Sequence, residues 1–160
     1  MKYPRLNRFL FLLFILVFSG HACFTQEEIN PVNWSVDLVE ENDTVKFIAR
    51  AVIEPGWHVY SQVISDDPEA MGPMPLEMKL DTSEYYVPLG NPVEKSRMIT
   101  HFDKAFGIDL NYYENELVVV QPLKIINLDG VVKGFISYMA CDDEKCIFPP
   151  EYTFELKLGK

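Results

Sequence analysis

Hydrophobic and polar residues alternate in short runs along most of the chain after residue 30, and turn residues separate these runs. Alternation with a period of two places successive side chains on opposite faces of a β-strand. The run 57–63 therefore has His58 and Tyr60 on one face, and Trp57 and Val59 on the other. The predicted strands are 34–39, 45–53, 57–63, 76–80, 85–89, 108–113, 117–126, 131–140 and 152–158.

The segments between these runs are predicted to be turns and loops. A polar, proline-rich loop is expected at 65–75, and a less regular loop with aromatic residues at 98–107. The sequence Asn-Leu-Asp-Gly at 127–130 is typical of a β-hairpin turn. From residue 26 onward we find no amphipathic helical period and no linker that divides the chain. We therefore predict one all-β domain at 26–160, an antiparallel β-sandwich of the immunoglobulin-like type.

The first 25 residues have the pattern of a secretory signal. Three basic residues precede an apolar run at 9–18, which is followed by small residues at 19–22. We predict that residues 1–25 are a signal peptide, cleaved near residues 22–25, and that the domain is exported to the periplasm. A less favoured alternative is a lipoprotein anchored to a membrane through Cys23. Export matters because disulfides persist in oxidising compartments.

The charge of the chain limits the kinds of partner that it can bind. The formal net charge is −10, and it becomes −13 when the three basic residues of the signal are removed. An acidic chain of this kind is a poor ligand for nucleic acid and for anionic lipid. We therefore expect no nucleic-acid partner, no membrane contact other than a lipid on Cys23, and a monomeric domain.

Cys141 and Cys146 are the pair that remains if Cys23 is removed or lipidated. A disulfide across so short a loop stabilises the folded chain by about 2 kcal/mol, less than a bond between distant strands. We therefore interpret the pair as redox-active, exchanging electrons through a mixed disulfide. The acidic run 142–144 between the sulfurs disfavours a thiolate, so we expect ordinary or raised cysteine pKa values. Such cysteines suit an electron carrier, and the acidic run favours a partner with a basic docking face.

Four segments, in this order, resemble the amino-terminal periplasmic domain of DsbD, the thiol:disulfide interchange protein. Gly-Trp-His-Val-Tyr at 56–60 is similar to that family's Gly-aromatic-aromatic-x-Tyr strand. His-Phe-Asp-Lys-Ala-Phe-Gly at 101–107 is similar to its cap loop, and 117–126 to the strand that follows. The segment 138–151 carries both cysteines and a Pro-Pro-Glu tail, and it resembles the active-site hairpin. This last segment is the specific part of the resemblance.

The resemblance implies a thiol–disulfide oxidoreductase that needs no cofactor. Its electron donor would be a thioredoxin-like domain linked to a membrane-embedded reductant, and its substrates would be disulfide-bonded periplasmic proteins. By position, Cys141 and Cys146 would be the catalytic pair, and we favour Cys146 as the attacking thiol and Cys141 as the resolving one. The supporting residues by the same reasoning are His58, Tyr60, Phe102, Asp103, Phe106 and Tyr138.

The chain departs from the family pattern in three respects. Four residues separate its cysteines, where the best-known members have five. Ala105 stands where a capping Phe is expected, so shielding of the pair would depend on Phe102 or Phe106. The sequence printed for the chain continues into no membrane-spanning or thioredoxin-like region, so we expect a free-standing version with a separate electron donor.

The rival interpretation is a non-catalytic exported binding module. In that case the two cysteines would form a static clip, or they would bind zinc together with His58 and His101. Thioether sulfur suits Cu(I), so a copper site built from methionines and a histidine is a further alternative. Scattered methionines more often fill gaps in a core. The methionines concerned are Met71, Met74, Met78 and Met98.

Overall fold

The computed structural model of the protein describes residues 30–41, 44–69 and 71–159. The predicted signal peptide at 1–25, its cleavage region and Cys23 lie outside the described residues. Within the described ranges, no helix is long and apolar enough to cross a membrane. The same ranges form these strands: β1 (Val32–Glu41), β2 (Thr44–Ile53), β3 (His58–Tyr60), β4 (Glu77–Leu80), β5 (Tyr86–Pro88), β6 (Val93–Glu94), β7 (Ile99–Asp103), β8 (Ile108–Glu114), β9 (Glu116–Ile125), β10 (Val131–Ser137), β11 (Ala140–Cys141), β12 (Cys146–Ile147) and β13 (Tyr152–Lys157).

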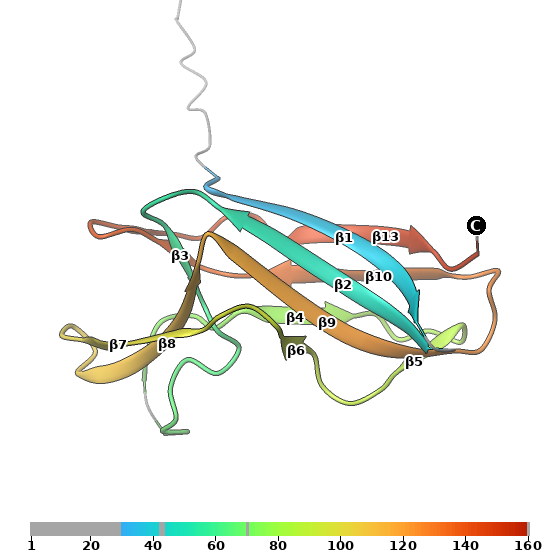
Figure 1. Ribbon diagram of the computed structural model, residues 1–160, viewed down its shortest axis with the longest axis horizontal. Coiled ribbons are helices and arrows are strands. Elements are labelled where there is room, and N and C mark those ends of the chain that lie inside the picture. Colours follow the sequence, from blue (N-terminus) through green and yellow to red (C-terminus); the bar gives the residue numbers. More distant parts are fainter. Residues whose placement is uncertain (1–29, 42–43, 70, 160) are drawn as a thin grey trace, which may run out of the picture.

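The strands form three antiparallel sheets, which confirms the predicted all-β, immunoglobulin-like sandwich. One layer has the order β1-β2-β9-β5, with β6 also paired to β9, and the other layer has the order β13-β10-β4. The third sheet, β12-β11-β3-β8-β7, is called the end sheet below. Figure 1 shows β7 and β8 at one end of the molecule, and β5 and the C-terminus at the other.

The principal core lies between the two layers of the sandwich. Phe47 and Ala49 of β2 are fully buried, as are Val119 of β9 and Ile136 of β10. Phe47 also packs against Phe154 of β13, with 4.7 Å between the ring centroids. The period-two alternation therefore places one face of each layer in the core, because water is excluded from the apolar side chains there.

The prediction of a β-hairpin at 127–130 is wrong. β9 pairs with β2, β5 and β6, whereas β10 pairs with β13 and β4, so this turn crosses from one layer to the other. The crossing places apolar side chains of both β9 and β10 in the principal core. Residue 130 must be glycine because of close packing and not because of a hairpin turn. An added Cβ there would lie 2.1 Å from Cγ of Tyr85.

Two further predictions of local structure need correction. Part of the loop predicted at 98–107 is strand β7, which pairs with β8 along its whole length. The strand predicted at 131–140 is two strands, β10 and β11, in different sheets.

The change of sheet after β10 allows four consecutive side chains to be buried. Tyr138 and Ala140 belong to the principal core. Met139 and Cys141 alternate with them and belong to a smaller core that also includes Tyr60. The end sheet therefore separates two cores, and Cys141 faces the smaller one.

Candidate functional site

The two cysteines lie directly opposite each other in the short hairpin formed by β11 and β12. They form a disulfide with an S–S distance of 2.02 Å. Asp142 closes the loop between them. Its backbone N–H donates to the carbonyl of Lys145 at 2.9 Å, and its Oδ1 accepts the N–H groups of Glu144 and Lys145, both at 2.8 Å. Aspartate is favoured at such a position because its short side chain bonds to the backbone of the turn.

The two sulfur-bearing residues differ in their exposure to solvent. Cys141 is 1% exposed and packs in the smaller core, whereas Cys146 is exposed. An attacking thiolate must reach a sulfur atom for exchange to begin. The arrangement therefore leaves Cys146 accessible from solvent and keeps Cys141 covered.

The disulfide lies in an open cleft of about 630 Å³ on the end sheet. The walls of the cleft come from β3, β7, β8, the turn after β7 and the cysteine hairpin, which are distant in the sequence. The cleft brings together most of the residues that the sequence singled out. These are Cys141, Cys146, His58, Tyr60, Asp103 and Phe106.

Phe102 does not line this cleft, although it is a neighbour of residues that do. His101 and Asp103 on the same strand line it, so the two-residue period of β7 directs Phe102 to the opposite face. The side chain of Phe102 is 52% exposed there. Of the two aromatic residues expected to shield the disulfide, Phe106 therefore lines the same cleft as the cysteines.

Tyr138 is also outside the cleft, because the strand alternation turns its side chain into the principal core. Its ring packs edge-on against Trp34 with 5.6 Å between centroids. Its hydroxyl donates to Oδ1 of Asn30 at 3.0 Å, and burial raises the pKa of the phenol. The structure thus gives Tyr138 packing partners away from the disulfide.

Asp103 organises the turn that carries Phe106. Its Oδ1 accepts the backbone N–H groups of Ala105 at 2.7 Å and Phe106 at 3.1 Å. Its backbone carbonyl accepts the N–H of Gly107 at 2.7 Å, and Gly107 has a φ of 74°, which glycine adopts without strain. Asp103, which we named as a supporting residue, therefore both lines the cleft and shapes this turn.

Three aromatic rings form one wall of the cleft. The centroid of the His58 ring lies 5.1 Å from that of Tyr60 and 4.8 Å from that of Tyr112. Burial lowers the pKa of His58, and the charge of Glu114 is the strongest of the influences that oppose this shift. Burial also raises the pKa of Tyr60, with a further contribution from the charge of Asp103.

Tyr112 and Glu114 line the cleft, and the sequence analysis did not identify them. The signal was present in the alternation along 108–114, where Leu110, Tyr112 and Glu114 share one face. The predicted strand ended at residue 113, which assigned Glu114 to a turn.

The cleft is strongly acidic. Lys145 brings a positive charge to it, and its Nζ lies 5.7 Å from the centroid of the Trp57 ring. The backbone N–H groups of Glu144 and Lys145 lower the pKa of Asp142, so this carboxyl is ionised over a wide pH range. The carboxylates of the lining are Asp103, Glu114, Asp142, Asp143 and Glu144.

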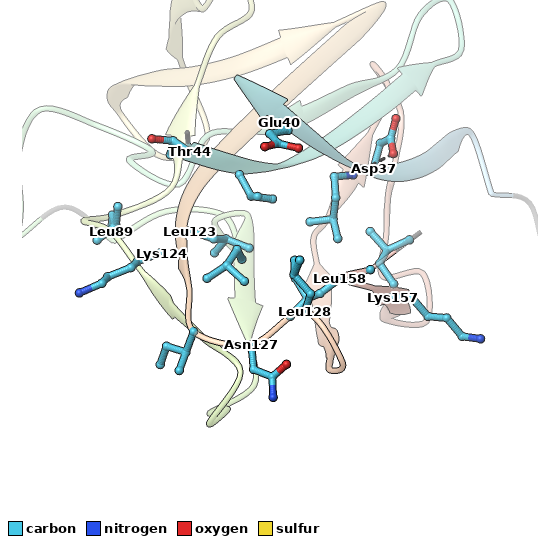
Figure 2. Close-up of a pocket in the computed structure, with 16 residues that line it drawn as sticks. Asp37, Glu40, Thr44, Leu89, Leu123, Lys124, Asn127, Leu128, Lys157 and Leu158 are labelled. Carbon is cyan, nitrogen blue, oxygen red and sulfur yellow. Dashed lines mark hydrogen bonds between the residues drawn. The ribbon is translucent and has the colours of Figure 1, made fainter. Parts of the chain in front are cut away.

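A larger hollow of about 880 Å³ lies at the opposite end of the sandwich (Figure 2). Leu123, Leu128 and Leu158 point into it, and Lys124 and Lys157 lie at its rim. It contains none of the residues that the sequence analysis proposed for the site. The larger of these two cavities is therefore not the one that holds the cysteines.

The described residues contain no group of three or more His, Cys, Asp and Glu side chains arranged to hold a metal ion. His58 and His101 both line the cleft, but the two cysteines are joined to each other. The methionines considered for copper lie in different surroundings. Met78 is in the principal core, Met74 packs against the smaller core, and Met71 and Met98 are exposed.

An immunoglobulin-like sandwich with a disulfide in an open cleft has the features of a thiol–disulfide exchange domain. A family model described as "Thiol:disulfide interchange protein DsbD, N-terminal" matches residues 26–158. The chain therefore belongs to this family of DsbD amino-terminal domains. No sequence among the curated proteins matches the chain.

Solved structures provide a comparison of the fold. The N-terminal periplasmic domain of ScsB from Proteus mirabilis is 18% identical, with a TM-score of 0.59 over 84% of this chain. The alignment covers 49% of the ScsB chain, so this protein spans about half the length of that relative. The reduced DsbD N-terminal domain of Neisseria meningitidis is 20% identical over 79% of this chain and 85% of its own, with a TM-score of 0.49.

A third structure is a complex between the DsbD N-terminal and PilB N-terminal domains from Neisseria meningitidis. Its matched chain is 18% identical over 78% of this chain and 81% of its own, with a TM-score of 0.47.

Proposed function

We propose that this protein is an exported thiol–disulfide oxidoreductase of the periplasm, which passes electrons through Cys141 and Cys146. It accepts electrons from a thioredoxin-like donor and reduces disulfide-bonded proteins. The observation that carries the proposal is the disulfide in an open cleft, with Cys146 exposed and Cys141 buried. We expect the domain to act as a monomer, and we assign the roles of the two cysteines from the difference in their exposure.

In the proposed reaction, the thiolate of reduced Cys146 attacks a disulfide of the substrate protein and forms a mixed disulfide. Cys141 then attacks the sulfur of Cys146 and releases the substrate as a thiol. Two electrons pass from the dithiol to the substrate disulfide, and the donor restores the dithiol by the reverse sequence. Phe106 shields the disulfide between encounters.

The acidic cleft favours a donor and substrates that carry basic residues around their own cysteines. Complementary charge raises the rate of encounter more than it raises affinity. The proposal therefore predicts that exchange with protein partners slows as salt concentration rises, because salt screens exposed charges. A small neutral thiol such as dithiothreitol lacks this charge pattern and provides the matched control.

The reduction potential of the pair tests the proposed function against a static clip. The mature domain would be equilibrated with glutathione buffers and its thiols trapped by alkylation. We expect a value between about −180 and −270 mV, the range of known exchange proteins. A value below about −300 mV would identify a structural bond and overturn the proposal.

The attacking residue is tested by trapping. In the Cys141→Ala variant, we expect Cys146 to form a stable mixed disulfide with a partner or with glutathione. In the Cys146→Ala variant, the buried Cys141 forms it far more slowly, because 1% of its surface is exposed. Mass spectrometry of the conjugates measures both rates, and equal rates would contradict the assignment.

A further inference from the structure

Four residues of the cleft form one row across the end sheet. Cys146 is the pairing partner of Cys141 between β12 and β11. Cys141 is the partner of His58 between β11 and β3, and His58 is the partner of Glu114 between β3 and β8. Residues directly opposite each other on neighbouring strands project from the same face of a sheet. The order across the row is therefore thiol, thiol, imidazole and carboxylate.

The buried position of Cys141 creates a chemical requirement. Cys141 must lose its proton before it attacks the mixed disulfide, because the thiolate is the nucleophile. It is 1% exposed and belongs to the smaller apolar core, so water has little access to it. Nearby carboxylates and burial both disfavour a thiolate. A basic group at the neighbouring position would meet this requirement.

His58 has the surroundings of such a base. It is half-buried and its ring is held between Tyr60 on its own strand and Tyr112 on β8. The charged groups that influence it are Glu114 of β8, Asp103 of β7, and Asp142 and Asp143 of the cysteine loop. Burial lowers its pKa, so the imidazole is neutral near pH 7 and has a free lone pair.

We propose that His58 accepts the proton of Cys141 in the resolving step and that Glu114 is a positioning residue that stabilises the resulting imidazolium. This inference rests on the proposed function and assigns the proton transfer within it. The proton moves from Sγ of Cys141 to the imidazole. A bond forms between the Cys141 and Cys146 sulfurs, the bond from Cys146 to the substrate sulfur breaks, and the substrate leaves as a thiolate. The imidazolium then gives this proton, through water, to the substrate thiolate and returns to its neutral form. When the donor reduces the disulfide, the departing Cys141 thiolate takes up a proton by the reverse route, through His58.

The test uses the full reduced domain and glutathione disulfide as the probe. Acid-quenched samples analysed by mass spectrometry separate the dithiol, the glutathione adduct and the internal disulfide, which gives the rate of resolution. We expect His58→Gln to slow resolution by about 100-fold at pH 7, within the range of general base catalysis. The glutathione adduct of Cys146 then accumulates, and the rate loses its dependence on histidine ionisation.

His101→Gln is the matched control. His101 lines the same cleft, but it lies on β7, and β8 separates that strand from His58. Its substitution is expected to leave the rate of resolution unchanged. A His58→Gln variant with the wild-type rate and the wild-type pH profile would overturn the inference.

Glu114→Gln provides an independent measurement at an exposed position. The charge of Glu114 raises the pKa of His58, so its removal shifts the rise of the resolution rate to lower pH. An unshifted profile would contradict the role of Glu114.

The Cys141→Ala variant distinguishes a failure of the proposed function from a failure of the inference about His58. If Cys146 forms no adduct in this variant, then the proposed function is wrong and the inference falls with it. Normal adduct formation together with normal resolution in His58→Gln would overturn the inference alone.

Discussion

Phe102 and Phe106 show how single residues with the same chemistry acquire different surroundings. Both are exposed aromatic residues of the segment that resembles the family's cap loop. Phe106 lines the cleft, because the turn organised by Asp103 brings it beside the cysteine hairpin. Phe102 is directed away by the strand alternation. The sequence placed both rings in one segment but could not show that only Phe106 lines the cleft.

We predict that Phe106→Ala speeds reduction of the oxidised domain by dithiothreitol several-fold, because the shield beside the disulfide is removed. Phe102→Ala is the matched control and should react at the wild-type rate. Stopped-flow or alkylation-quench kinetics measure both variants. Equal effects of the two substitutions would exclude a specific shielding role for Phe106.

At the scale of elements, the short strand β6 connects the sandwich to the end sheet. β6 pairs with β9, and its Glu94 side chain bonds to residues directly after β3 and to β8. Glu94 accepts the hydroxyl of Ser61 at 2.6 Å, the backbone N–H of Gln62 at 2.9 Å and the hydroxyl of Tyr113 at 3.0 Å. Burial, followed by the charge of Glu94, raises the pKa of Tyr113, so the phenol remains a donor.

We predict that Glu94→Ala lowers the free energy of unfolding by about 3 kcal/mol, because it leaves buried donors without their acceptor. Urea unfolding of the oxidised domain measures the change. Glu116→Ala is the control, since its pair with Arg50 is 3.6 Å long and exposed, and such pairs contribute about 0.5 kcal/mol. A similar small loss in both variants would show that Glu94 does not connect the sheets.

The whole molecule responds to pH through His58, because burial in the end sheet lowers its pKa below the value of about 6.5 in unfolded chains. The folded state therefore binds fewer protons than the unfolded state below pH 6.5. The corresponding stability is present above this pH and is lost as the pH falls towards the folded pKa. Cys141 and Cys146 do not contribute in the oxidised domain, because they are joined in the disulfide.

We predict that wild-type protein loses more stability than His58→Gln between pH 7.5 and pH 5.5. Urea midpoints at a series of pH values, with both proteins oxidised, give the comparison. Parallel curves for the two proteins would contradict the lowered pKa of His58.

The sequence by itself determined the features that depend on neighbouring residues. Alternation identified the all-β class, and the cysteine segment 138–151 was the specific part of the resemblance to the DsbD amino-terminal domains. His58 and Tyr60 were assigned to one face, because a period of two fixes this along any strand. Export was inferred from the first 25 residues, which lie outside the described structure.

The tertiary structure alone decided which strands are neighbours and in what register. The turn at 127–130 crosses between layers because apolar side chains of β9 and β10 enter the same core from different layers, a non-local requirement. For the same reason, Tyr138 faces the principal core whereas Cys141 faces the smaller one. The row that joins Cys141 to His58 and Glu114 spans three strands distant in sequence, so it exists only once their register is fixed by packing.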